Sequence, residues 1–377
     1  MAVGGPAWHL RGTVVLDDAR EVGEVWVVDG RFTFTRPTIE TTTLEGVVLP
    51  GLVDVHCHIG LAADGRVPDD VAEQQALADR DSGVLLVRDA GSPADTGWVH
   101  ARDDLPRLIR SGRHLALPKR YLRNYGRELA SPDDLPAAVV EEADRGDGWV
   151  KLVADWIDRD LGADADLRPL WPREVLTEAI GAAHAAGARV TAHTFATESL
   201  DDLLDAGIDC LEHATGASDE HIDRIAAAGI PVTATLLQVA QFPAIAAQGA
   251  RFGRFAARMA AMGERRYEHV RNLHEAGVRV LVGTDAGGTI GHGRIAEEAL
   301  EMQRAGIPAH DVVAAASWRT RAWLGVPSIE EGASADVVVY ADDPRTDVRA
   351  LATPRAVVLR GAAYPAPADG QSGSAGR

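Results

Sequence analysis

The 377-residue sequence predicts an α/β protein: a (β/α)8 TIM barrel with a small β-sandwich domain formed by both chain ends. Two observations carry this prediction. Short β-branched runs alternate with longer, alanine-rich helical stretches from about residue 84 to 306. In addition, no glycine-rich dinucleotide fingerprint follows the first strand, which argues against a doubly wound sheet. Eight strand–helix units of this length favour a barrel.

The eight expected strands are short apolar runs separated by helical segments. Several of the helical segments end in glycine, as at Gly187, Gly207 and Gly229, which is the residue expected in a left-handed cap. The strands are expected at residues 52–60, 84–91, 114–122, 149–155, 189–195, 208–215, 230–237 and 278–287.

Two further pieces contain alternating runs with turn residues and fall outside the barrel. The simplest arrangement joins residues 1–48 and 326–362 into one composite β-sandwich domain that flanks a catalytic barrel of residues 49–325. The last segment, 363–377, has almost nothing to bury and is expected to be a disordered tail.

Composition limits the partners and the compartment. A formal charge of −18 argues against nucleic acid and anionic membranes as partners. The two cysteines form no C-x-x-C pair, which excludes a disulfide framework. We see no signal peptide and no run of about 20 apolar residues, so a cytoplasmic location is expected. No heptad pattern indicates an interface, so the sequence does not decide whether the protein forms a homo-oligomer.

Histidine, lysine and aspartate recur where the expected strands end. His56 and His58 share one face of the first strand because side chains alternate with a period of two. The corresponding residues on later strands are Lys151, His193, His213 and Asp285. Barrel enzymes build their active sites at the carboxyl ends of the strands, so these side chains are expected to converge.

Each of these residues also has a purely structural explanation. A His-x-His pair arises by chance, a single buried histidine is more often a core residue, and Asp285 is well placed to cap a helix. Lys151 is the hardest to explain in this way, because an ammonium among apolar neighbours is costly to bury unless it is paired, neutralised or modified. Six such residues at strand ends together favour a metal site.

These residues, in this order, resemble the binuclear metal site of the amidohydrolase superfamily. The segments "VRDAG", "LEHATG", "GTDAG" and "IEEGASADVVVYADDP" are similar to the branch that contains imidazolonepropionase-like enzymes and Xaa-Pro-type dipeptidases. The resemblance implies two divalent ions: His56, His58 and Asp285 on one, and His193 and His213 on the other. It also implies N6-carboxylation of Lys151 by CO2, which bridges both ions. Nitrogen and oxygen ligands suit Zn²⁺, with manganese or iron as alternatives.

The function that this resemblance implies is hydrolysis of a carbon–nitrogen bond in a small-molecule amide, dipeptide or cyclic amide. A hydroxide between the metal ions attacks the carbonyl carbon, and Asp285 serves first as base and then as acid. No Gly-x-Ser-x-Gly nucleophile elbow is present.

Three other functions remain open. A mononuclear zinc deaminase typically lacks the bridging lysine and carries a glutamate close to a later histidine, whereas Glu198 lies five residues beyond His193. The same metal pair also serves phosphotriester or lactone hydrolysis. A catalytically silent scaffold protein usually has lost metal ligands, and all six positions are filled here.

The loops that follow the strands indicate candidate substrate contacts. Tyr125 is a candidate to polarise a carbonyl, and Arg123 or Arg127 to pair with a substrate carboxylate, although this basic loop is equally explained as solvated surface. His292 is expected either to contact substrate or to cap the next helix. The long segments 155–172 and 238–259 are expected to form a lid or the pocket walls.

Overall fold

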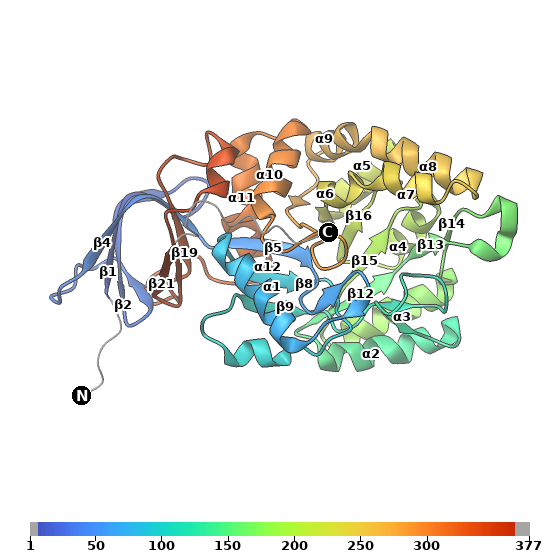
Figure 1. The fold of residues 1–377 in the computed structure, drawn as a ribbon, viewed down its shortest axis with the longest axis horizontal. Coiled ribbons are helices and arrows are strands. Elements are labelled where there is room, and N and C mark those ends of the chain that lie inside the picture. The colour runs from blue at the N-terminus through green and yellow to red at the C-terminus, as the bar shows by residue number, and fades with distance from the viewer. Residues whose placement is uncertain (1–6, 366–377) are drawn as a thin grey trace.

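The computed structural model describes residues 7–365. The fold has two parts: parallel strands surrounded by helices, and a layer of strands at one side of them (Figure 1). That layer is one seven-stranded sheet in the order β21-β20-β19-β4-β1-β2-β3. Its strands come from both chain ends: β1 (Trp8–Val15), β2 (Glu21–Val28), β3 (Arg31–Thr33), β4 (Thr42–Pro50), β19 (Val337–Tyr340), β20 (Ala356–Leu359) and β21 (Ala362–Pro365).

The two chain ends meet where β4 pairs with β19 in antiparallel register, with Val48 opposite Val339. This sheet has its own apolar cluster, in which Leu10, Val27 and Val358 are fully buried. The strands of both ends lie in one sheet, and the sandwich itself stays a prediction. The expected tail begins later than residue 363, since β21 pairs with β20 up to Pro365; residues 366–377 lie outside the described part.

The second group of strands is entirely parallel, which confirms the α/β class. One sheet has the order β5-β8-β9 and the other β11-β10-β12-β15-β16-β17-β18. The strands are β5 (Leu52–Cys57), β8 (Val84–Asp89), β9 (Arg107–Arg110), β10 (Leu115–Ala116), β11 (Arg127–Glu128), β12 (Trp149–Val153), β15 (Arg189–Thr194), β16 (Cys210–His213), β17 (Val232–Thr233) and β18 (Val280–Leu281).

Each of the eight expected segments contains one of these strands, but the third was misjudged. β9 pairs with β8 and β10 pairs with β12, so residues 107–116 behave as one interrupted strand. Gly112 lies at the interruption with φ +67°, a backbone conformation that glycine adopts without strain. The strand therefore begins earlier than residue 114 and ends at Ala116, well short of residue 122.

The segment after β18 lies against β5. Val55 N–H donates to Val282 O at 3.1 Å, Asp285 N–H to His56 O at 2.7 Å, and His58 N–H to Ala286 O at 2.8 Å. A Cβ at Gly283 would lie 2.7 Å from His56 Cβ, so only glycine permits this approach. The contact places Asp285 beside His56 on β5 and His58 directly after it.

The helices cover the parallel strands, whose apolar side chains are buried in one large cluster and in a second, smaller one. Gly187, Gly207 and Gly229 have φ values of 80°, 80° and 66°, which confirms the expected caps. The α-helices are α1 (Asp69–Asp81), α2 (Leu135–Arg145), α3 (Arg173–Ala185), α4 (Leu200–Asp205), α5 (Asp219–Ala228), α6 (Leu236–Val239), α7 (Phe242–Gln248), α8 (Gly253–Glu264), α9 (Arg266–Glu275), α10 (Ile295–Arg304), α11 (Ala309–Ala316) and α12 (Trp318–Leu324).

Short elements occupy the loops between these helices and strands. Two small hairpins are formed by β6 (Leu61–Ala62) with β7 (Gly65–Arg66), and by β13 (Asp155–Ile157) with β14 (Leu167–Pro169). The 3-10 helices are η1 (Gly97–Ala101), η2 (Pro132–Asp134), η3 (Arg159–Asp164), η4 (Thr197–Ser199) and η5 (Val348–Ala352). Among the described residues, no helix combines the length and apolarity that crossing a membrane requires.

Candidate metal centre

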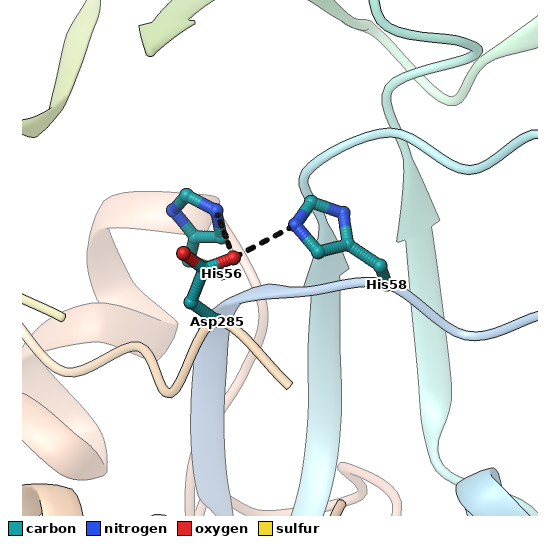
Figure 2. A group of neighbouring side chains, drawn as sticks. All are labelled: His56, His58 and Asp285. Carbon is teal, nitrogen blue, oxygen red and sulfur yellow. Dashed lines mark hydrogen bonds and ion pairs between the residues drawn. The ribbon is translucent and has the colours of Figure 1, made fainter. Parts of the chain in front are cut away.

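His56, His58 and Asp285 bring three ligand atoms together (Figure 2). His56 Nε2 lies 3.2 Å and His58 Nε2 lies 3.0 Å from the same oxygen, Asp285 Oδ1. His58 Nδ1 lies 2.6 Å from Gly91 O, and because a carbonyl only accepts, Nδ1 carries the proton. His58 Nε2 is thereby left to face the carboxylate oxygen of Asp285, and in the tautomer with the proton on Nδ1 it offers a lone pair to a cation bound between them.

His193 on β15 and His213 at the end of β16 form a second pair. His213 Nε2 lies 3.0 Å from His193 Nδ1. The hydroxyl of Thr235 donates to Ala234 O at 2.9 Å, so its oxygen is left to accept from His213 Nδ1 at 2.6 Å. His213 Nε2 is thereby left unprotonated and directed towards His193. Two ring nitrogens this close together are a suitable pair of ligands for a divalent ion.

Lys151 lies on β12, fully buried, and its ammonium contacts the carboxylate of Glu212. Burial lowers the pKa of Lys151 to about 7; Arg88 acts in the same direction, and Asp285 opposes it. Glu212 also accepts a hydrogen bond from Thr191 Oγ1 at 2.8 Å and lies 3.5 Å from Arg88 Nη2. Glu212 thus links Lys151 to the cluster, because its carboxylate lies within ligand distance of His56 and His213.

Glu212 is a functional candidate that the sequence interpretation missed. Alternation along β16 predicts that neighbouring Glu212 and His213 face opposite sides of the strand. His213, however, has φ 65°, a left-handed conformation that interrupts the alternation and brings both side chains to the cluster. The available signal was a glutamate inside the apolar run 208–215, which is the same reasoning that singled out Lys151.

The histidines are electrostatically suited to bind a metal. Burial lowers the pKa values of His56 and His193 well below the usual range and that of His213 to about 3, so all three rings are neutral. Burial alone would raise the pKa of Asp285, but its interactions with His56 and His58 hold that pKa well below its usual range. Neutral imidazoles and an ionised carboxylate are the donor set that a divalent cation binds. The residues therefore fit a divalent metal.

A cavity of about 580 Å³ opens beside these side chains and is lined by His58, His193 and Asp285. Of the two candidate substrate contacts, Tyr125 lines the cavity and His292 does not. His292 Nδ1 lies 2.8 Å from Asp79 Oδ2 of α1, and its side chain is only 3% exposed. The pairing turns His292 away from the cavity.

The two long segments form cavity walls as expected: β13, η3 and β14 contribute Trp156, Arg159 and Leu167, and the region of α6 to α8 lines the opposite side. Neither of the two candidate arginines of the basic loop lines the cavity. Arg127 is bound to Glu141 and Glu142, and Arg123 does not line the cavity.

Tyr121 was also missed. Its ring centroid lies 5.6 Å from that of His193 and 5.0 Å from that of Trp156. Because residues 114–122 were expected to be a strand, Tyr121 was not considered as part of the loop above the site. Its neighbour His114 lies 5.0 Å from His58 between ring centroids and has both ring nitrogens buried without a hydrogen-bond partner.

The Thr235 hydroxyl is expected to orient His213 for metal binding. Thr235→Val keeps the shape of the side chain but removes the acceptor for His213 Nδ1. Loss of such a supporting hydrogen bond lowers metal affinity by about 10- to 100-fold. Competition with a chromogenic chelator measures the change. Thr177→Val, at an exposed position on α3, is the control, and an unchanged affinity in Thr235→Val would contradict the orienting role.

A family model described as "Amidohydrolase family" matches residues 47–362. An uncharacterized protein of Mycobacterium tuberculosis is 49% identical over 358 residues, which cover 94% of this chain and 95% of that protein. The imidazolonepropionase of Salinispora arenicola is 28% identical over 317 residues, covering 74% of this chain and 72% of the enzyme.

Among solved structures, an Xaa-Pro dipeptidase with bound methionine superimposes with a TM-score of 0.79 at 22% identity. The alignment covers 95% of this chain and 100% of that chain. At this level of identity the likeness establishes the shared fold.

Proposed function

We infer that this chain, which belongs to the amidohydrolase family, is a metal-dependent hydrolase of carbon–nitrogen bonds in small molecules. The family match confirms the membership that the strand-end residues and their resemblance to this family led us to expect. The observation that carries the chemistry is the convergence of His56 Nε2 and His58 Nε2 on one oxygen of Asp285 at 3.2 and 3.0 Å. Such a cluster at the carboxyl ends of parallel strands binds a divalent ion beside an open cavity.

We propose that the centre is binuclear. His56, His58 and Asp285 would hold one Zn²⁺, and His193 and His213 would hold the other. N6-carboxylated Lys151 would supply an anion shared by both positions. The support is that Lys151 is fully buried, where its cationic form is costly, and that it contacts Glu212, which lies within ligand distance of His56 and His213. Lys119 and Lys151 are the only lysines in the chain, and an arginine at this position would not accept CO2.

When bound, two divalent ions supply Lewis acidity towards a carbonyl oxygen and activation of a water molecule for attack. Asp285 is the carboxylate that faces both the histidines and the cavity, with a side chain 17% exposed. It accepts the proton of the attacking water and delivers it to the leaving nitrogen. Burial raises the pKa of Tyr125 to about 12, so its hydroxyl stays protonated and can donate to the substrate carbonyl.

One observation supports the deaminase alternative: Glu212 lies next to His213, and a deaminase is expected to carry a glutamate close to a later histidine. The carboxylate of Glu212 is, however, already bound by Thr191 and lies against Lys151 and Arg88. The other glutamate considered, Glu198, forms two hydrogen bonds with Arg258. Neither carboxylate is free to act as a proton shuttle, and amide hydrolysis remains the better-supported function.

We also propose a closed barrel, a sandwich-like flanking domain and a cytoplasmic location. The hydrogen bonds from Val55 and His58 to the segment after β18 support a closed eight-stranded barrel. The composite sheet of both chain ends supports a sandwich-like flanking domain. Cys57 and Cys210, both buried and unpaired, support a reducing compartment such as the cytoplasm.

The proposal is tested by elemental analysis of the protein expressed with bicarbonate, followed by a substrate screen. We expect about two divalent ions per chain and release of amine from neutral and charged amides of the screen. One ion per chain would refute the binuclear centre. Ammonia release from aminated heterocycles, or turnover restricted to phosphotriesters or lactones, would refute amide hydrolysis.

A further inference from the structure

The cavity beside the metal-ligand residues has an unusual lining for a site that would bind a charged peptide. One part of its lining, which begins beside His193, is an apolar wall of aromatic and aliphatic side chains: Tyr121, Trp156, Phe195, Phe252, Phe255 and Met259. We propose that the substrate is a neutral amide carrying a bulky apolar, preferably aromatic, group, and that zwitterionic dipeptides are poor substrates. This proposal rests on the proposed amide hydrolysis and specifies its substrate class.

The apolar wall is a preformed surface. Phe195, Phe255 and Met259 belong to one buried cluster that joins the β13–β14 hairpin to α7 and α8. The Phe195 ring packs edge-on against Phe242, with centroids 4.8 Å apart. Because core packing holds these side chains in place, an aromatic group of the substrate gains burial without first ordering the wall.

The charges around the cavity do not match those of a dipeptide. Among the lining residues, the only cations are Arg159 and Arg251, and both are exposed at the rim. Arg120, behind the wall, is held by Asp158 at 3.2 Å and by Arg168 O at 3.1 Å. A substrate carboxylate placed against this wall would therefore be buried without a partner, which is unfavourable.

A substrate ammonium meets a similar difficulty. Within the described part of the chain, Asp285 is the only acidic side chain that lines the cavity, and its Oδ1 already faces His56 and His58. The uncharged polar groups of the lining include Gln238, Gln241 and Thr289, which suit hydrogen bonding to a neutral amide. The volume of about 580 Å³ accommodates an aromatic ring together with the scissile bond.

A matched pair of amides tests the proposal. N-(4-nitrobenzyl)phenylacetamide and N-(4-carboxybenzyl)phenylacetamide have nearly the same shape and differ in charge, and the methylene separates the substituent from the scissile amide. We expect kcat/KM to be about 10- to 100-fold higher for the neutral compound, because a carboxylate loses its hydration without gaining a partner. The dipeptide Phe-Gly is expected to be at least as poor a substrate as the carboxylate.

Two variants connect the selectivity to the wall. Phe255→Ala is expected to lower kcat/KM for the nitrobenzyl amide about tenfold through lost burial, and the matched control is Phe34→Ala at an exposed position far from the cavity. Phe252→Arg places a cation at a half-buried wall position and is expected to reduce the preference for the neutral amide by about tenfold.

Calorimetric binding of both amides to the slowly reacting Asp285→Asn variant separates this proposal from the proposed function. Tighter binding of the neutral amide without any hydrolysis by the wild type would support the selectivity of the cavity for neutral aromatic ligands and refute amide hydrolysis. Hydrolysis with equal or greater preference for the carboxylate or the dipeptide would overturn the inference and leave amide hydrolysis in place.

Discussion

Asp285→Asn is expected to reduce kcat about 10³- to 10⁴-fold for a neutral amide substrate while the protein keeps most of its metal. The substitution preserves the shape of the side chain and an oxygen that can face His56 and His58. An amide cannot accept a proton from the attacking water, nor return one to the leaving nitrogen. Steady-state kinetics together with elemental analysis measure the two effects separately.

The control for this prediction is Asp342→Asn, at an exposed position after β19. This control is expected to keep wild-type activity and wild-type metal content. If Asp285→Asn loses its metal in proportion to its activity, Asp285 acts as a ligand alone. If it retains activity within about tenfold of the wild type, another group moves the proton.

Lys151→Ala is expected to lose at least one of the two divalent ions and to lower kcat/KM by at least about 10³-fold. The physical reason is that the N6-carboxylate would be the anion shared by both metal positions. Without it, the pairs His56–His58 and His193–His213 would each hold an ion with fewer ligands, and the mutual repulsion of two dications would be less compensated. Elemental analysis and kinetics report the loss.

The two-lysine composition allows a direct test of the carboxylation. After expression with ¹³C-bicarbonate, the wild type and Lys119→Ala are expected to show a carbamate resonance that is absent from Lys151→Ala. A resonance that persists in Lys151→Ala, or wild-type metal content in that variant, would contradict the bridging role. Contact between Lys151 and Glu212 would then be a purely structural ion pair.

Local patterns in the sequence were enough to predict the α/β class and much of the candidate centre. The period of a strand placed His56 and His58 on one face, and the cost of burying an ammonium drew attention to Lys151. Glycines at helix ends predicted the caps confirmed at Gly187, Gly207 and Gly229. Each of these inferences depends on residues within a few positions of one another.

The features that the sequence interpretation missed depend on backbone exceptions and on contacts between distant segments. The left-handed conformation of His213 brought Glu212 into the cluster, and a break near Gly112 divided one strand into β9 and β10. The ion pair between His292 and Asp79 joins positions 213 residues apart and removes His292 from the cavity. The periodicity of side chains along a strand or helix predicts neither a local backbone exception nor a contact between distant segments.

The sequence by itself therefore determined which histidine, lysine and aspartate side chains stand at the strand ends as candidate ligands, because alternation and burial cost are local properties of the chain. Only the tertiary structure decided what surrounds them. The apolar wall combines Trp156, Phe195 and Phe255 from separate elements, and its lack of a buried cation becomes visible once Arg120 is placed against Asp158. A cavity is the space left between packed elements, so its shape and charge follow from how those elements meet.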